Sequence, residues 1–370
     1  MSIHLAIILS SISILTALSM LIINRKILTR IGISTLALFV LILTGCSYHN
    51  ENEPKAKKAD DEKQVIVIHE NKEENVKQPF LKEIDPYVIR DDFKGNISKE
   101  EIESYKQIID AILNYQASIT LNTDMYSNIL LDYLIDASPY ANLVKNTHFD
   151  DTYQTMYIDY NYSKDKHAHA INVIHDFYYD LINNHIEKDM NDVDKTLMIY
   201  QCIGNYMSYD YDWYERFINS EDPYHFPEIK VVEGIKRKKG VCHTYCYMMQ
   251  FALQQLGIEN ILVQGLYNDN YDDQHMWMMV KLNQHYYHID PTWDDQNEDG
   301  NVSLQYFGLS DQQREAQGFT MRSGYYNVEY GEILCENTDF DNLHNVKSYT
   351  YKGNHKWLMK ADEGSFDYET

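Results

Sequence analysis

A cysteine at the predicted start of a helix is the feature that most limits how this chain can fold. After Gly240 the apolar residues recur with the spacing of one helical face, and Gly257 follows where such a helix would end. Cys242 therefore lies in the first helical turn, where free backbone N–H groups and the helix dipole favour an anion. A thiolate is such an anion and is the attacking form of cysteine. Gly240 is expected to allow a tight turn and to leave space beside the sulfur.

A hairpin is predicted further along the chain. Two runs of strand-forming residues stand on either side of Asn283-Gln284, which we interpret as a tight turn. If the residues flanking this turn face each other, His275 lies diagonally opposite Asp290 on one face of the hairpin, because side chains alternate along a strand. Diagonal neighbours are roughly 7–8 Å apart at the backbone, which lets a carboxylate reach an imidazole. Spacing alone does not show that Cys242 packs against this face.

The segments GVCHTYC (240–246) and HMWMMVKLNQHYYHIDPTWDD (275–295) resemble the transglutaminase-like superfamily, a branch of the papain-like thiol enzymes. Its bacterial members carry a G-x-C-x-x-[YF] segment, an H-[AS]-W strand and a strand ending in D-P-T-W-D. The close resemblance spans about residues 195–310. It implies an α+β fold, in which the nucleophile helix packs on an antiparallel sheet and a helical region precedes this core.

By that resemblance Cys242 is the nucleophile, His275 the general base and acid, and Asp290 the carboxylate that orients the histidine. The sequence departs from the family pattern at Met276, where Ser or Ala is usual, and at Thr244, where a smaller residue is frequent. Both departures leave the reacting groups unchanged and are expected to reshape the substrate groove.

The implied chemistry is acyl transfer through a thioester. The thiolate attacks an amide carbonyl, the histidine protonates the leaving amine, and the backbone N–H of Cys242 is the expected oxyanion donor. Some further residues are candidates for a second oxyanion donor or for a wall of the cleft, the two tryptophans being equally consistent with ordinary core: Asn205, Tyr209, Trp277 and Trp293.

The charge balance excludes some classes of partner. The chain carries 56 acidic and 32 basic side chains, a formal net charge of −24. A phosphate backbone must be met by Lys and Arg, so nucleic acid is not an expected partner. The same balance disfavours binding of the folded part to an anionic membrane surface. The family resemblance implies protein or peptide substrates, including cell-wall-associated ones.

The cysteine and acidic patterns do not predict a metal or a cofactor. Five cysteines occur, without the dense framework of a small disulfide-bonded domain: Cys46, Cys202, Cys242, Cys246 and Cys335. The C-x3-C spacing beside His243 allows a zinc site, but no second Cys or His pair follows at the spacing such sites need. The acidic loop 294–301 resembles a calcium loop in part, yet no Glu follows its Gly at the expected distance.

The N-terminus predicts export. The apolar run 31–44 follows a basic stretch, is short for a bilayer span and matches a signal peptide. Leu43-Thr44-Gly45-Cys46 resembles a bacterial lipobox, so Cys46 is the expected lipid attachment site, and two acyl chains suffice for stable anchoring. An ordinary transmembrane anchor is the alternative. A second apolar run at 3–23 is either a real span or lies upstream of a true start at Met20, which we favour.

Five segments are predicted along the chain. They are a signal peptide or membrane segment, a flexible lipid-anchored tether, a helical region with one strand, the transglutaminase-like catalytic core and a strand-rich extension: 1–45, 46–84, 85–190, 191–320 and 321–370.

The combined prediction is an extracytoplasmic, lipid-anchored thiol enzyme of the bacterial surface that acts on amide bonds. Water as the second substrate makes it a protease or amidase, which we favour, and a lysine amine makes it a transglutaminase. The alternative is a surface binding protein that retains the fold without activity and presents an aromatic cleft to a peptide or a glycan.

Overall fold

The computed structural model describes residues 79–89, 98–121, 138–152, 154–221, 229–295, 301–321 and 333–370. The predicted signal peptide, the start at Met20, Cys46 and most of the acidic loop 294–301 therefore lie outside the described residues. Within the described ranges, no helix is long and apolar enough to cross a bilayer. The predicted tether is described only from residue 79, and its last residues are fixed to the core. There the Leu81 N–H donates to Asn183 Oδ1 at 2.9 Å, and Ile84 is buried.

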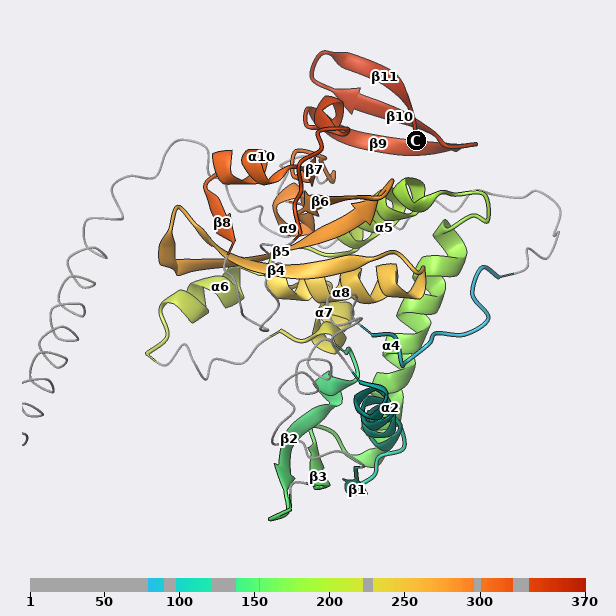
Figure 1. Cartoon of the computed structure of the whole chain (residues 1–370), viewed down its shortest axis with the longest axis vertical. Helices are drawn as coiled ribbons and strands as arrows, with labels where there is room; N and C mark the ends of the chain where they lie inside the picture. Colours follow the sequence, from blue (N-terminus) through green and yellow to red (C-terminus); the bar gives the residue numbers. More distant parts are fainter. Residues whose placement is uncertain are drawn as a thin grey trace, which may run out of the picture. The chain divides into compact units, whose positions relative to one another are not determined.

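A five-stranded antiparallel sheet forms the centre of the fold, with the strand order β7-β6-β5-β4-β8 (Figure 1). Its strands are β4 (Asn260–Tyr267), β5 (Asn270–Leu282), β6 (His285–Ile289), β7 (Phe307–Leu309) and β8 (Phe319–Met321). Leu282 pairs with His285, which confirms the predicted register of the hairpin. Asn283 and Gln284 make the turn with φ of 49° and 71°, the left-handed conformation of a tight two-residue hairpin.

Helices cover one face of this sheet, as Figure 1 shows, with α8 (Cys242–Gln255) against β4 and β5 and α5 (Asp192–Tyr206) beside α8. Alternate residues of β5 face opposite sides. Met276 and Met278 join the main core, to which α8 contributes its apolar residues. Trp277 and Met279 join a smaller core with Phe319. This arrangement confirms the predicted α+β class, in which the nucleophile helix packs on an antiparallel sheet.

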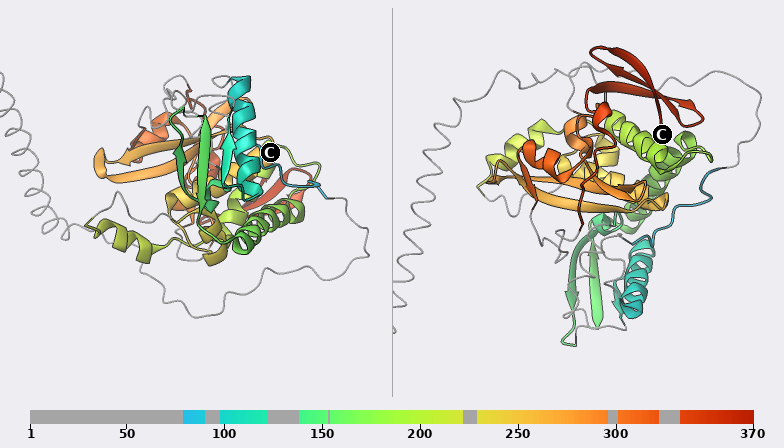
Figure 2. Two further views of the ribbon diagram at one scale, coloured as in Figure 1. Left: turned by 90° about the horizontal axis from the view of Figure 1, so that it is seen from below. Right: turned by 45° about the horizontal axis from the view of Figure 1, so that its top comes forward.

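The region before the core contains more β-structure than predicted. It has α2 (Lys99–Leu113), α4 (Lys164–His185) and a three-stranded antiparallel sheet in the order β1-β3-β2 (Figure 2). The single predicted strand corresponds to β3 (Thr155–Tyr160). We did not predict β1 (Ser118–Thr120), which has only three residues, or β2 (Val144–Phe149), whose central residues are exposed and polar. Neither strand carries the apolar alternation that marks a half-buried strand.

The remaining helices are short and border the core. They are α6 (Tyr211–Ile218), α7 (Val231–Arg237), α9 (Pro291–Asp294) and α10 (Asp311–Ala316). Two single 3-10 turns, Ala141–Leu143 and Asp341–Leu343, complete the described elements.

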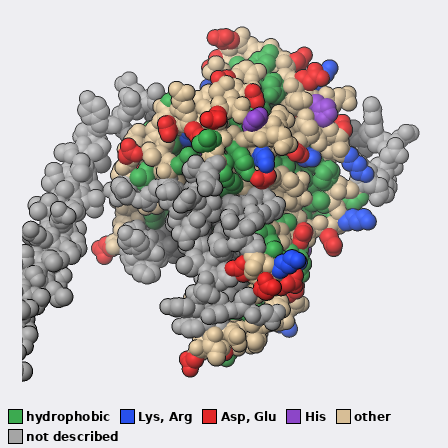
Figure 3. All heavy atoms as spheres, viewed as in Figure 1, with side chains coloured by type: hydrophobic (Ala, Val, Ile, Leu, Met, Phe, Trp, Pro, Cys, Tyr) green, Lys and Arg blue, Asp and Glu red, His purple; other side chains and the backbone are tan. Residues whose placement is uncertain are grey.

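The strand-rich extension packs on the core through apolar side chains, among them Trp357 and Met359, and through one buried carboxylate. β9 (Val346–Gly353), β10 (Lys356–Ala361) and β11 (Gly364–Glu369) form an antiparallel sheet beside α5 (Figures 1 and 2). Asp194 of α5 is fully buried and accepts hydrogen bonds from this sheet and the chain end: Trp357 Nε1 at 2.7 Å, His355 Nδ1 at 2.6 Å and Thr370 Oγ1 at 2.7 Å. Acidic side chains are spread over the face seen in Figure 3, as the charge of the chain predicts.

Candidate active site

Cys242 is the first residue of α8, and Val241 precedes it in extended conformation as the N-cap. This placement confirms the predicted helix start. The side chains nearest to a Cβ at Gly240 would be Thr244, at 2.6 Å, and Met207, at 2.9 Å, and these contacts were not expected from the sequence. Thr244 is buried, and its hydroxyl donates to the Ile229 carbonyl at 2.8 Å. The absence of a Cβ at Gly240 therefore leaves room for the Thr244 side chain in the first turn of α8.

The hairpin brings His275 and Asp290 into direct contact. His275 Nε2 lies 2.7 Å from Asp290 Oδ2, and the carboxylate is almost fully buried. Asp290 is also the N-cap of α9, where its Oδ1 accepts the backbone N–H groups of Thr292 and Trp293, both at 3.2 Å. Two helix N–H groups thus fix one carboxylate oxygen and leave the other for the imidazole.

Hydrogen bonding and charge set the protonation of these groups. Burial alone would raise the pKa of the Cys242 thiol, but hydrogen bonds with His243 and His275 outweigh it and lower this pKa to about 5. Burial would lower the pKa of His275, yet the charge of Asp290 and the hydrogen bonds with Asp290 and Cys242 raise it to about 9. At neutral pH the site therefore contains a thiolate, an imidazolium and a carboxylate.

Arg314 of α10 is a fourth charged residue of the site, which the sequence did not reveal. Its side chain is buried, and Nη2 donates to Asp290 Oδ2 at 2.6 Å. The guanidinium lies 4.6 Å from the centre of the Trp277 ring and 3.5 Å from that of Phe319. Although burial would raise the pKa of Asp290, the charges of His275 and Arg314 lower it to about 2. A helix of six residues carries too little periodicity for the sequence to indicate where its side chains point.

The four residues predicted as oxyanion donors or cleft walls do not all lie at the site. Asn205 is an exposed residue of α5 and makes no hydrogen bond to the triad within the described part of the chain. Tyr209 pairs by a backbone bridge with Gly240, beside the nucleophile. Burial and then the charge of Cys242 raise the pKa of Tyr209, so its hydroxyl stays protonated and able to donate. Trp277 and Trp293 both face His275, with ring centroids at 6.0 and 5.8 Å.

The two tryptophans differ in exposure, and the two residues that depart from the family pattern are buried. Trp277 is fully buried and belongs to the smaller core, whereas Trp293 is only partly buried at its edge. Met276 and Thr244 are both buried in the structure, so they do not line a substrate groove as we had expected.

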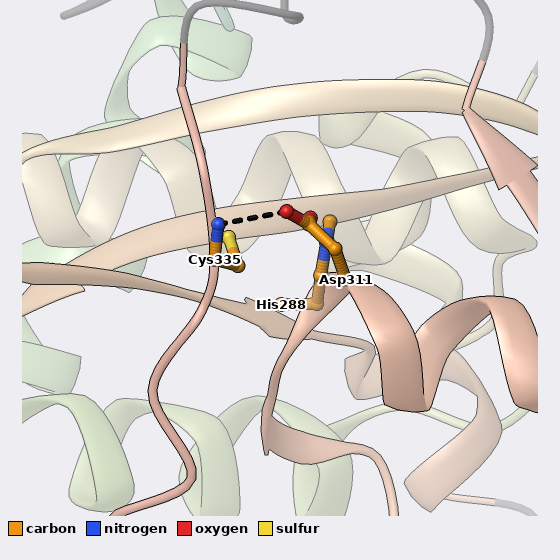
Figure 4. Close-up of side chains that lie close together, drawn as sticks. All are labelled: His288, Asp311 and Cys335. Atoms are coloured by element: carbon orange, nitrogen blue, oxygen red, sulfur yellow. Dashed lines mark hydrogen bonds and ion pairs between the residues drawn. The ribbon is translucent and has the colours of Figure 1, made fainter.

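A second cluster of ligand-type side chains lies beside the site (Figure 4). Ligand atoms of His288, Asp311 and Cys335 lie within 4.8 Å of one another. Trp277 Nε1–H donates to His288 Nδ1 at 3.0 Å, so the neutral ring carries its proton on Nε2, which donates to Asp311 Oδ1 at 2.8 Å. Metal binding would need Nε2 without that proton. Burial also raises the pKa of the Cys335 thiol, which disfavours a thiolate ligand. These residues therefore form a hydrogen-bonded cluster that does not suit a metal.

The C-x3-C pair, for which the sequence did not favour a zinc site, likewise makes other contacts. Cys246 is buried, and its thiol donates to the Met276 carbonyl at 3.3 Å. Burial raises the pKa of Cys246 well above its usual value. At the start of the acidic loop, Asp294 is buried and accepts hydrogen bonds from Tyr200 and Ser303. Cys246 and Asp294 are therefore both engaged in contacts within the protein.

The structure combines a cysteine at a helix start with a His–Asp pair on an antiparallel sheet, which is the arrangement that the sequence resemblance implies. Residues 180–291, which include Cys242, His275 and Asp290, match the family model described as the transglutaminase-like superfamily. The chain therefore contains a transglutaminase-like domain, as the sequence motifs predicted.

Two solved structures are similar to parts of the chain. One, described as a TGase, is 16% identical and aligns over 54% of each chain with a TM-score of 0.29. The other, from Cytophaga hutchinsonii and described as a candidate cysteine protease, is 15% identical, covering 35% of this chain and 40% of that one with a TM-score of 0.21. The chain thus spans about half the length of the first structure. Comparison with curated proteins finds no match.

Proposed function

We propose that this protein is a thiol acyl-transfer enzyme that acts on amide bonds of proteins or peptides through a thioester at Cys242. The observation that carries the proposal is the geometry of the site, in which Cys242 begins α8 and His275 Nε2 lies 2.7 Å from Asp290 Oδ2. The pKa of Cys242, lowered to about 5, and that of His275, raised to about 9, agree with this geometry. Groups tuned apart in this way supply a nucleophile and a proton donor at the same pH.

The reaction follows from these positions. The Cys242 thiolate attacks the amide carbonyl carbon, and the C=O electrons move to the oxygen. The Cys242 backbone N–H at the helix start stabilises that oxyanion, with the Tyr209 hydroxyl as second donor. When the C–N bond breaks, the His275 imidazolium protonates the leaving amine and a thioester remains. Asp290 keeps the imidazole in the required tautomer and stabilises its charge.

The second half-reaction decides the class of enzyme. Neutral His275 takes a proton from the incoming nucleophile, which attacks the thioester and releases the thiolate. Water gives a protease or amidase, and a lysine amine gives a crosslink. We propose hydrolysis, because water reaches a thioester unless a bound acceptor excludes it, and amine transfer needs that exclusion.

The test is activity profiling of surface proteins with wild type and Cys242→Ala, read by mass spectrometry. New peptide termini or Gln-to-Glu conversions that need Cys242 are the expected result. Gln–Lys crosslinks that need Cys242 would retain the thioester but replace hydrolysis by amine transfer. The thiol enzyme proposal fails if both forms leave the same peptides, and the alternative of a binding module for peptide or glycan then stands.

We also propose that the protein is anchored outside the cytoplasm by a lipid on Cys46. The support is the lipobox-like sequence 43–46 after an apolar run with a basic flank. Full-length protein with Cys46→Ser is expected to move from the membrane fraction to the soluble fraction in a bacterial host, and the wild-type N-terminal peptide to begin at a diacylated Cys46. An unmodified Cys46 within a longer peptide would contradict the anchor. Any peptide from upstream of Met20 would rule out the later start.

A further inference from the structure

Two rows of side chains connect the same three elements at the active site. Each row takes one residue from β5, one from β6 or the residue that follows it, and one from α10. They are the catalytic row His275–Asp290–Arg314 and the second row Trp277–His288–Asp311. Corresponding members lie two residues apart in the strands and three apart in the helix. They therefore share a strand face or a helix face.

Two members of the second row are buried, the third is partly exposed, and the polar atoms of the row are paired. Trp277 and His288 are 0% and 1% exposed. The indole N–H donates to His288 Nδ1 at 3.0 Å, and Nε2 donates to Asp311 Oδ1 at 2.8 Å. Asp311 Oδ2 accepts the Cys335 N–H at 2.9 Å (Figure 4). A buried network with its polar atoms satisfied is rigid and specifies one arrangement of the elements that carry it.

The two rows touch each other directly. The Trp277 ring lies nearly parallel to His275, with an interplanar angle of 19°. The guanidinium of Arg314, which belongs to the catalytic row, packs on the same Trp277 ring, 4.6 Å from its centre. Asp311 is the first residue of α10, so its bond to His288 fixes the helix that brings Arg314 to Asp290. A shift in the second row must therefore move the catalytic row.

We propose that His288 and Asp311 are positioning residues of the thiol site. The bond between them holds β6 and α10 in the register at which Asp290 meets both His275 and Arg314. This inference rests on the proposed function, because it concerns how the same thiolate–imidazolium pair is set. It assigns a role to a cluster that the catalytic steps do not use.

Charge effects and positioning predict opposite outcomes for Asp311. His288 is faced by Trp277 from β5 and by Asp311 and Arg314 from α10. Loss of the negative charge of Asp311 by itself would favour the Cys242 thiolate and lower the pKa of Cys242. Loss of positioning would weaken the contact of His275 with Cys242 and raise that pKa. The direction of the shift in Asp311→Asn therefore separates the two.

The experiment measures alkylation of Cys242 by iodoacetamide between pH 4 and 10 in the full-length protein, by mass spectrometry of the peptide that contains it. In wild type the rate is expected to rise with a midpoint near pH 5. His288→Phe keeps a ring but loses both hydrogen bonds, and Asp311→Asn keeps the shape. Each is expected to raise the midpoint by about one unit, a tenfold change in the ionisation constant.

Tyr287→Phe is the matched control. Tyr287 precedes His288 on β6, and its hydroxyl donates to Asp339 Oδ2 at 2.5 Å. The Tyr287 side chain packs in the main core rather than beside Trp277. The substitution removes one hydrogen bond near His288 and is expected to lower thermal stability without moving the midpoint. A midpoint that is unchanged or lowered in Asp311→Asn, which is partly exposed and expected to fold, overturns the inference. A wild-type midpoint in the ordinary range near 8.5 would instead overturn the proposed function.

Discussion

Alanine in place of His275 is expected to lower turnover by about 10²–10⁴-fold, the contribution of a positioned general acid or base. The same change raises the pKa of Cys242, because one of the two imidazoles that hydrogen bond to its sulfur is lost. At pH 6 a thiol with a pKa of about 5 is mostly thiolate. One returned to the ordinary value near 8.5 is ionised to well under about 1%. Both quantities can be measured, the first with a cleavable amide and the second with a thiol alkylating agent.

The activity of wild type is expected to fall at both low and high pH. Below about pH 5 the thiolate of Cys242 takes up a proton and activity falls. Above about pH 9 the imidazolium of His275 loses its proton and the leaving amine is no longer protonated. The profile of kcat/KM is therefore expected to be bell-shaped between these values, which belong to the coupled pair.

His243 provides a matched control for His275. Both imidazoles hydrogen bond to Cys242, but the bond to Asp290 belongs to His275. His243→Ala is expected to move only the acidic limb upward, because proton donation by His275 is retained. Equal loss of turnover in the two variants would show that His275 has no separate role as an acid, and the mechanism would need revision.

Local patterns were sufficient to predict two of the pieces that build this site. Helical spacing placed Cys242 in the first turn of α8, and strand alternation set the register that joins His275 to Asp290. Both depend on residues close together in sequence, where backbone periodicity decides which side chains share a face. The catalytic roles of these residues stay predictions until they are measured.

Long-range packing explains what could not be predicted. Arg314 and Asp311 lie on a six-residue helix, and only the docking of that helix on β6 turns them toward Asp290 and His288. No periodicity in so short a segment reports that docking. The packing around Gly240 was missed for a similar reason, because the side chains that require the absence of a Cβ there are Thr244 and Met207, the latter far away in sequence.

Asparagine in place of Asp290 is expected to destabilise the fold by about 3–5 kcal/mol, the usual cost of leaving a buried charge without its partner. Asn keeps the shape of the side chain but not its charge. Arg314, only 1% exposed, would then keep a buried guanidinium without a counter-ion. Urea unfolding at pH 7 measures the effect as a lower midpoint at unchanged slope.

The acid sensitivity of stability has a defined sign here. The pKa of Asp290 is lowered from 3.8 to about 2 in the fold, so its contribution to stability is present above pH 4 and is lost as the pH falls toward 2. In Asp290→Asn that part of the pH dependence is expected to disappear. A variant that retains wild-type stability and acid sensitivity would contradict the ion pair with Arg314.

Replacing both partners separates stability from chemistry. In the double variant Asp290→Asn/Arg314→Met the buried cation is gone. An apolar side chain then faces Trp277 and Phe319, the rings that contact the guanidinium in wild type. Apolar replacement of a buried ion pair is often neutral, so most of the lost stability is expected to return. Activity is not expected to return, because His275 still lacks its carboxylate. The coupling between the two substitutions, read as a double-mutant cycle, would be near zero if Arg314 acted independently of Asp290.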